Sequence, residues 1–227
     1  MKSTSERDWL VNFGLFVLSM ILFILVPTIM ALTLFFIPSK LISLISSIVY
    51  ILIIFLIYKN DLIKEFDTFK NNFKNCFKTG LKYYIGGLLA MVFFNMVISV
   101  VIKDVSANEN AVRDMLFSSP VLTMLSIAIT APLSEELLFR KSVGTLTKNK
   151  WIFAVLSGLL FGGAHLLAGE FKLINLLFIL PYGSLGFAFA LMDHETKSTW
   201  TSVMMHAMHN TLTGIMLLSM YFSGALS

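Results

Sequence analysis

The chain has 227 residues, of which 57% are hydrophobic and only 13% are charged, so it is far more apolar than an ordinary globular domain. Its one cysteine, Cys76, excludes an intrachain disulfide framework and cannot form a cysteine-based metal site by itself. The formal net charge is +4, but the Lys and Arg residues lie in short segments between apolar runs, where positive charge orients membrane helices. The composition therefore predicts an all-α polytopic membrane protein and argues against nucleic-acid binding.

The apolar runs are long enough to cross a membrane several times. Because roughly 20 apolar residues span a bilayer, the pattern predicts about seven transmembrane helices, with six to eight compatible with soft boundaries. The first run is too long for the hydrophobic core of a signal peptide, so we expect it to be retained as a membrane anchor. Pro27 is expected to kink it. The predicted segments are residues 10–37, 41–58, 83–102, 118–139, 151–168, 173–192 and 199–222.

The connection between the second and third spans, residues 59–80, has the pattern of an amphipathic helix. Leu62, Phe66, Phe69, Phe73 and Phe77 recur at steps of three and four, with lysines between them. This pattern favours a helix on the anionic cytoplasmic leaflet, although a connector packed against other helices would look the same. The chain divides into N-terminal membrane helices, residues 1–117, and a C-terminal helix bundle, residues 118–227, which carries the candidate catalytic residues.

The basic residues are distributed unevenly between the two ends of the predicted helices. Of the 17 Lys and Arg residues, 13 fall at one end, and the other end holds Lys40, Lys103, Arg113 and Lys172. Because cytoplasmic loops are enriched in Lys and Arg, the N-terminus is predicted to be cytoplasmic and the C-terminus outside.

Ionisable side chains within membrane spans are costly, so each is a functional candidate. The pattern places Glu135 and Glu136 in the fourth predicted span, His165 in the fifth, and His206 and His209 in the seventh. A short turn at residues 148–150 would put Glu135 and His165 at nearly equal depth in an antiparallel hairpin, and His206 lies about 12 to 14 Å into its helix. We therefore expect these three side chains at one level below the cytoplasmic face, in a thinned or water-filled region.

Helical spacing separates the charges of the fourth span into two tasks. Glu136 and Arg140 are four residues apart and can pair, whereas Glu135 points about 100° away and stays available. His206 and Asn210 share a face in the same way. A buried carboxylate beside imidazoles can take a proton from a water that attacks a carbonyl, while His and Asn donors stabilise the oxyanion.

Other chemistry is compatible with the same residues. Glu135, His165 and His206 could hold a zinc ion with one open position, although the HExxH motif of common zinc proteases is absent. The polar groups could also form a structural ion pair or the proton relay of a transporter, but the short chain without inverted repeats disfavours a transporter. His209 is expected to be a packing residue.

Three ordered motifs, EELLFR at 135–140, FGGAH at 161–165 and HAMHN at 206–210, resemble those of one family of intramembrane proteases. This is the CAAX protease and bacteriocin-processing family, also called Abi or type II CAAX prenyl endopeptidases. The resemblance covers about residues 118–222. The family patterns EExxxR, FxxxH and HxxxN fall on Glu135, Glu136 and Arg140, on Phe161 and His165, and on His206 and Asn210.

The resemblance implies an endopeptidase that cleaves within or at the membrane. Glu135 and His165 would activate the attacking water, His206 and Asn210 would form the oxyanion site or help bind a metal, and the remaining motif residues would support them. The resemblance leaves the need for zinc open. Lys141 departs from the Gly of many relatives, for which we expect a local change at the helix end rather than lost activity.

The resemblance also limits the possible substrates and cellular roles. The compact chain and its residue bias favour a bacterial plasma-membrane protein whose substrate is a peptide or membrane-anchored protein with a hydrophobic portion. Its role would be bacteriocin or peptide maturation, CAAX-type processing or self-immunity. A non-catalytic immunity or scaffold protein that retains the motifs is the alternative, and the sequence does not indicate an oligomeric state.

Overall fold

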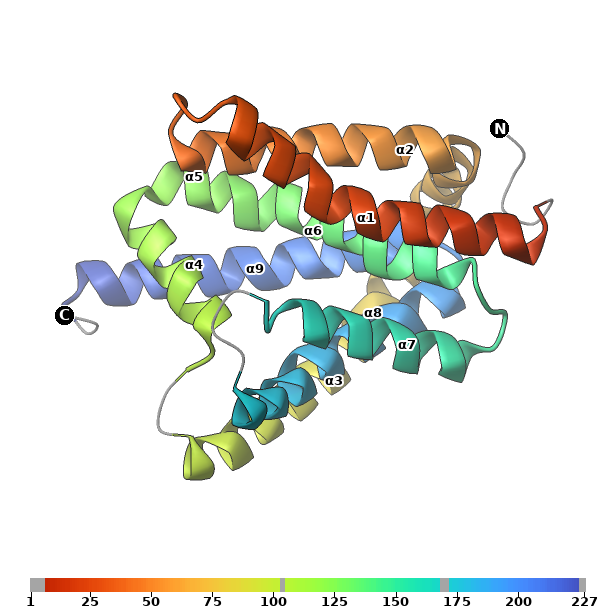
Figure 1. The fold of residues 1–227 in the computed structure, drawn as a ribbon. Helices are drawn as coiled ribbons and strands as arrows, with labels where there is room; N and C mark the ends of the chain where they lie inside the picture. The colour runs from red at the N-terminus through yellow and green to blue at the C-terminus, as the bar shows by residue number, and fades with distance from the viewer. Residues whose placement is uncertain (1–6, 103–104, 168–171, 225–227) are drawn as a thin grey trace.

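The computed structural model describes residues 7–102, 105–167 and 172–224, and helices with short connections account for nearly all of them (Figure 1). Lys2 and Lys103, which entered the charge distribution, lie outside the described residues. No strand occurs in the three ranges. The elements are α1 (Trp9–Thr33), α2 (Ser39–Asn71), α3 (Phe73–Val101), α4 (Ala107–Ser118), α5 (Pro120–Leu125), the π-helical turn η2 (Ser126–Thr130), α6 (Ala131–Glu136), the π-helical turn η3 (Leu137–Ser142), α7 (Lys150–Ala164), the 3-10 helix η4 (Leu173–Phe178), α8 (Ile179–Thr196) and α9 (Thr199–Phe222).

The predicted fold class, an all-α polytopic membrane protein, is confirmed. Within the described residues, five helices are long and apolar enough to cross a membrane: α1, α2, α3, the continuous helix Pro120–Ser142 and the helix Leu173–Thr196. The other two predicted spans are weaker. Helix α7 has 15 residues, so its length of about 22 Å is less than the roughly 30 Å of a hydrocarbon core. Helix α9 is long enough, but polar residues in it, such as His206 and Asn210, lower its hydropathy.

The amphipathic segment 59–80 is divided between two helices, contrary to the single helix predicted from its periodicity. Helix α2 bends at Tyr58, whose backbone angles (φ −109°, ψ 15°) are not helical, and continues to Asn71. The break follows at Asn72, where the side-chain amide donates to the Thr68 carbonyl over 3.0 Å, a local bond that competes with helix continuation. Leu62 is buried in the core, whereas Phe73 is exposed, so this segment contributes both to packing and to the apolar surface.

One end of the bundle, called here the lysine-rich end, is where α1, α3, α7 and α9 begin and where α2, η3 and α8 end. Hydrogen bonds join these termini: Trp9 Nε1 donates to the Leu146 carbonyl over 3.1 Å, and Trp200 Nε1 donates to the Leu62 carbonyl over 3.0 Å. The basic residues in its described helix ends and loops are Arg7, Lys59, Lys64, Lys70, Lys74, Lys78, Lys82, Lys148, Lys150 and Lys197.

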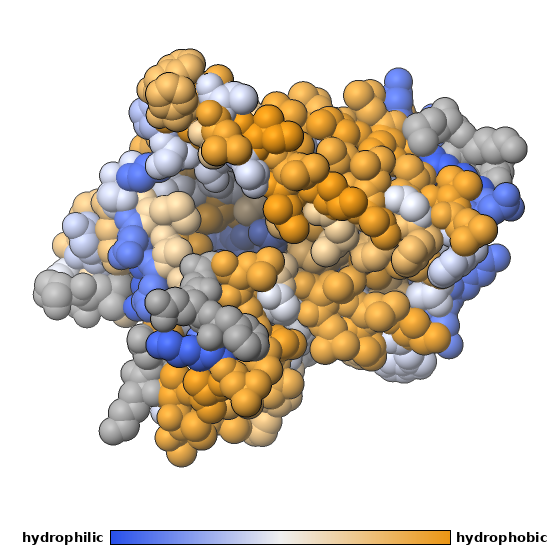
Figure 2. All heavy atoms as spheres, in the orientation of Figure 1, coloured by the Kyte–Doolittle hydropathy of each residue, from blue (hydrophilic) through white to orange (hydrophobic). Residues whose placement is uncertain are grey.

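The opposite end, called here the α4 end, is covered by the short helix α4. Phe117 of α4 stacks on Tyr221 near the end of α9, with ring centroids 4.2 Å apart. Lys40, just after the start of α2, donates to the hydroxyls of Ser118 and Ser119. Hydrophobic residues dominate the surface between the two ends, as Figure 2 shows. The bundle therefore has the surface of a membrane protein with two distinct polar ends.

Glycines allow α7 and α8 to pack closely. A Cβ atom at Gly162 of α7 would lie only 2.7 Å from the Ile179 carbonyl oxygen of α8, and one at Gly158 only 2.8 Å from the Gly183 carbonyl oxygen. Real side chains do not fit at such separations. The absence of a side chain at these positions therefore fixes the distance between two helices that flank the candidate site.

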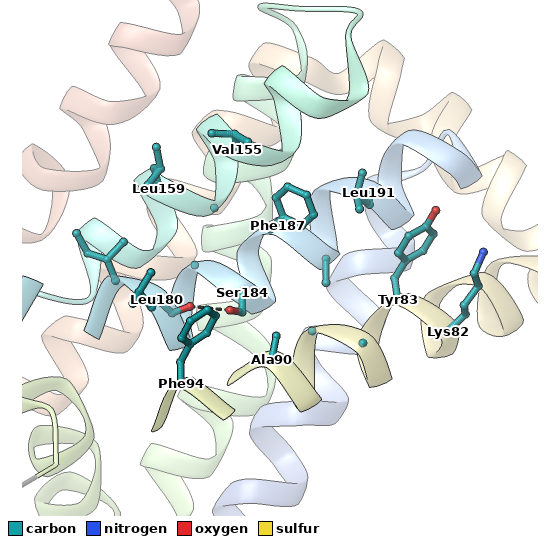
Figure 3. A pocket seen from close by; sticks show the side chains of 16 residues that line it. Lys82, Tyr83, Ala90, Phe94, Val155, Leu159, Leu180, Ser184, Phe187 and Leu191 are labelled. Carbon is teal, nitrogen blue, oxygen red and sulfur yellow. Dashed lines mark hydrogen bonds between the residues drawn. The ribbon is translucent and has the colours of Figure 1, made fainter. Parts of the chain in front are cut away.

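The outer faces of α3, α7 and α8 enclose an apolar groove of about 540 Å³ (Figure 3). Val155 and Leu159 of α7 and Phe187 of α8 line it, and Lys82 and Tyr83 stand at one end. None of the described residues that line this groove carries a carboxylate or an imidazole. It is therefore not a candidate for hydrolytic chemistry.

Two adjacent glycines provide a test of this packing. We expect Gly162→Ala to destabilise the protein by about 1–3 kcal/mol, because the new methyl group meets backbone that cannot move aside without shifting a helix. Gly163→Ala is the matched control, since a Cβ there has nothing within 4 Å, and alanine favours the helix. Thermal unfolding in detergent should give a lower midpoint for the first variant alone. Equal midpoints would show that α7 and α8 are not in close contact.

Candidate active site

Two π-helical turns interrupt the helix that carries the glutamates. In a π turn, the N–H of one residue bonds the carbonyl five residues earlier, so the carbonyl of Ile127 in η2 would be paired with residue 132. That residue is Pro132, which has no N–H to donate. Asn210 of α9 supplies the missing donor, with its Nδ2 lying 2.9 Å from the Ile127 oxygen. Pro132 thus accounts for the first of the two turns, η2, and for its attachment to α9.

A buried ion pair lies one residue beyond Glu135. Arg140 donates through Nε to Glu136 Oε2 over 2.6 Å and through Nη2 to Oε1 over 2.8 Å. A third donor, Nη1, reaches the hydroxyl of Ser157 on α7 over 2.8 Å. The guanidinium carbon also lies 4.7 Å from the centre of the Phe161 ring and 5.4 Å from that of Phe189. Such complete satisfaction is what makes a fully buried pair tolerable.

The same ion pair orients His206. Its Nδ1 lies 2.8 Å from Glu136 Oε1, and its Nε2 lies 3.8 Å from Glu135 Oε2. Glu136 therefore turns the second nitrogen of the ring towards Glu135. Glu135 Oε2 is itself buried and has no hydrogen-bond partner among the described residues. An unsatisfied buried polar atom costs roughly 1–3 kcal/mol, so this oxygen is a natural position for a ligand or a reacting water.

His165 terminates α7 on the opposite side of the site. Its Nδ1 is 2.8 Å from the Phe161 carbonyl, and its ring stacks on Tyr182 of α8 with centroids 4.3 Å apart. The Tyr182 hydroxyl is in turn hydrogen-bonded to Ser106 at the start of α4 over 2.6 Å. These contacts fix the imidazole plane and leave Nε2 as the nitrogen available for chemistry.

A cavity of about 710 Å³ brings these groups together. Glu135, His165, His206, His209 and Asn210 all line it. Its wall also includes residues of α3, α4 and α8, so six helices contribute to one space. In Figure 2 the surface is hollowed beside α4, with hydrophilic residues at the bottom of the hollow and hydrophobic ones around it. The arrangement can hold a water or a carbonyl next to a carboxylate inside an apolar wall.

The pairing of Glu136 with Arg140, expected from their spacing, is present in the structure, and Glu135 lines the cavity. His165 and His206, which follow Glu135 by 30 and 71 residues in the sequence, line the same cavity from two other helices. His209, expected to be a packing residue, does pack on Tyr84, whose hydroxyl lies 3.2 Å from its Nδ1. It also lines the cavity.

Several residues in contact with the site carried no signal in the sequence. Ser157 and Phe189 contact Arg140, and Tyr182 supports His165, but a serine, a phenylalanine and a tyrosine in apolar helices are ordinary. Asp193 is buried and accepts from the Ser202 N–H over 3.2 Å. It lies one residue past the predicted end of the sixth span, so the sequence did not single it out as an ionisable residue within a span.

Lys141, the departure from the family pattern, has a structural partner. Its ammonium group is nearly buried and is hydrogen-bonded to Glu65 in the bent part of α2. The other oxygen of Glu65 accepts the backbone N–H of Thr199, over 3.1 Å, at the start of α9. Lys141 therefore joins the helix of the glutamates to the one that carries His206, through a third helix.

The acidic side chains and imidazoles around the cavity are the candidate ligands of a metal ion. Among residues 7–102, 105–167 and 172–224, no three His, Cys, Asp or Glu side chains are grouped so that they could hold one. In particular, the proposed ligands Glu135, His165 and His206 do not form such a group. As arranged here, the donors do not fit a zinc centre.

Comparison with known proteins identifies the class. Residues 117–212 match the family model described as type II CAAX prenyl endopeptidase Rce1-like, and all three sequence motifs fall within that range. The predicted resemblance is therefore confirmed, and this region is similar to the type II CAAX prenyl endopeptidases.

One curated relative is similar over a longer stretch. The chain is 29% identical over 159 residues to a protein of Bacillus subtilis (strain 168) named "Putative membrane peptidase YdiL". The aligned part covers 66% of this chain and 62% of the relative, so the similarity extends over less than two thirds of that protein. No solved structure gives a significant match.

The buried ion pair makes a stability prediction. Replacing Glu136 by Gln leaves the Arg140 charge without a carboxylate in a dry environment, and breaking a buried pair costs about 3–5 kcal/mol. We expect Glu136→Gln to lower both the yield of folded protein and its thermal midpoint in detergent. Ser134→Ala is the control in the same helix, because the Ser134 hydroxyl bonds only the nearby Ala131 carbonyl. A variant Glu136→Gln as stable as wild type would contradict the structural role of the pair.

Proposed function

We propose that this protein is an intramembrane endopeptidase that uses Glu135 as the base. The observation that carries the proposal is the Glu135 carboxylate, which has an unpartnered buried oxygen 3.8 Å from an oriented imidazole, in a cavity large enough for a peptide segment. The match of residues 117–212 to a family model of endopeptidases supports it. The substrate would be a peptide or membrane-anchored protein, and the surrounding bilayer would be the plasma membrane, with the N-terminus cytoplasmic.

The chemistry follows from the positions of the groups. Glu135 accepts a proton from a water in the cavity, and the resulting hydroxide attacks the peptide carbonyl. The negative charge that develops on the carbonyl oxygen is stabilised by donors on the cavity wall, for which His165 and His206 are placed. Asn210 has two N–H groups, of which one bonds Ile127 and the other can serve the oxyanion. Protonated Glu135 then returns its proton to the leaving amine.

The remaining polar residues hold this arrangement in place. Glu136 and Arg140 fix the orientation of His206, and Phe161 packs between Arg140 and the two imidazoles. The alternative role, a non-catalytic immunity or scaffold protein, needs no unpartnered carboxylate facing a cavity. Proteolysis therefore accounts for a costly feature that the scaffold role leaves unexplained.

Removal of the base tests the proposal. Glu135→Gln preserves size but cannot accept the proton, so we expect cleavage to fall by about 10²–10⁴-fold with unchanged abundance in the membrane. Cleavage products would be identified by profiling new peptide termini in membranes with and without the protein. Glu195→Gln is the matched control, since this carboxylate bonds Tyr83 outside the cavity. Wild-type product levels in the Glu135→Gln strain would refute the catalytic role and favour the scaffold.

Metal dependence is tested separately. Because the three candidate donors do not form a metal-holding group, we propose that cleavage continues after dialysis against a tight zinc chelator, with residual zinc measured by mass spectrometry. Loss of activity on dialysis, with recovery when zinc is returned, would instead show that Glu135, His165 and His206 close around a metal during the reaction.

A further inference from the structure

The wall of the cavity reaches the α4 end of the bundle, where residues of α4 line it. We propose that the site receives its substrate from the α4 end, which is the extracytoplasmic face, so that the substrate is a segment exposed on the outer side of the membrane. The inference that a substrate enters here rests on the proposed function. The position of the cavity does not depend on that function.

The cavity wall extends from the glutamate towards α4. On α9 it follows His206, Asn210, Thr213 and Leu217 to Met220, which lies 14 residues further along the helix than His206, or about 21 Å. Five residues from α4 and its N-cap complete the wall at that end: Ser106, Asn108, Glu109, Val112 and Arg113. In Figure 1, α4 and the end of α9 lie at the end of the bundle opposite the start of α1. The mouth of the cavity is therefore polar and belongs to the α4 end.

The lysine-rich end of the site is closed. Between Glu135 and that end, the interior is filled by the Glu136 and Arg140 pair, with Ser157 and Ser202 behind it, all of them fully or almost fully buried. Phe139 and Phe189 seal the remaining space and are also buried. Glu135 lies only six residues, about 9 Å, from Lys141, so the catalytic groups are near the lysine-rich end in depth. They are nevertheless screened from it.

The distribution of charge decides which end is outside. The helix ends and loops of the lysine-rich end hold ten described Lys and Arg residues, whereas the described part of the α4 end holds Lys40, Arg113 and Lys172. Arg113 is in addition paired with Glu109 one turn away. Cytoplasmic loops carry the excess of Lys and Arg in membrane proteins. The α4 end, and with it the mouth of the cavity, is therefore extracytoplasmic.

The composition of the wall defines the class of segment that fits. Polar groups line the mouth, including Asn95 and Asn108, whereas the side wall contains Met91, Leu212 and Met216. Leu212 and Met216 are more than half exposed, so the apolar side wall is accessible from the lipid. Methionine adapts to varied apolar partners. A 21 Å wall matches about six residues of extended chain. The site is suited to an exported peptide or juxtamembrane segment in which polar and apolar residues are combined.

Cysteine accessibility tests the opening of the cavity. In a Cys76→Ala background, single cysteines replace Val112 at the mouth, Thr213 on the inner wall and Lys148 at the lysine-rich end. A charged, membrane-impermeant methanethiosulfonate is added to intact cells or spheroplasts, and unreacted thiols are then counted with a maleimide mass tag. We expect Val112→Cys and Thr213→Cys to lose maleimide labelling in intact cells. Lys148→Cys should lose it only after the membrane is permeabilised.

Two further variants make the result decisive. Leu89→Cys, on the exposed apolar surface of α3, should remain unreactive towards the charged reagent on either side, which controls for leakage into lipid. The experiment is repeated with Glu135→Gln, whose expected labelling is the same because accessibility does not require proteolysis. If Thr213→Cys does not react with the charged reagent in intact cells, the proposal is overturned, whether or not the cysteine reacts after permeabilisation. A loss of cleavage in the Glu135→Gln variant, with the same labelling, would not contradict the proposal.

Discussion

The bidentate pair between Glu136 and Arg140 is the interaction on which the arrangement of the bundle depends. It joins three helices, because Arg140 also binds Ser157 on α7 and Glu136 also holds His206 on α9. Charges buried so completely are stable only when each donor and acceptor is occupied. The pair therefore specifies a unique register among these helices, and a helix rotated by one residue would leave a charge unsatisfied. The same constraint places Glu135 next to His206.

Much of this could be predicted from the sequence, and the reasons are physical. Ionisable residues are so unfavourable in lipid that Glu135, Glu136, Arg140, His165 and His206 are conspicuous in an apolar chain. Spacing of four residues then correctly predicts which glutamate pairs with the arginine. The apolar runs predicted the helices, and the predicted second span ends at residue 58, where α2 bends. Local pattern was sufficient because these features are set by helix geometry and by solvation.

The remaining features depend on tertiary contacts that local pattern does not contain. The contact between Lys141 and Glu65 joins residues 76 apart, and neither residue indicates the other. Tyr182 lies beside His165 only because glycines let α7 and α8 approach closely. The π turn η2 could not be predicted, because it depends on the hydrogen bond from Asn210 to the Ile127 carbonyl, which joins two distant helices. The prediction of a single amphipathic helix for residues 59–80 was wrong. The spacing of apolar residues does not reveal a break at one residue, here Asn72, whose side chain bonds the preceding turn.

The attachment of Asn210 to the Ile127 carbonyl has a consequence for how enzymology on this protein should be interpreted. The amide of Asn210 replaces a backbone donor that Pro132 lacks, so it sets the pitch of the helix at η2, five to nine residues before Glu135. Changing Asn210 therefore alters the direction in which the base points as well as any charge stabilisation of the oxyanion. A kinetic defect in such a variant mixes two effects. The variant Pro132→Ala, which restores the N–H while leaving the amide in place, offers a way to separate them.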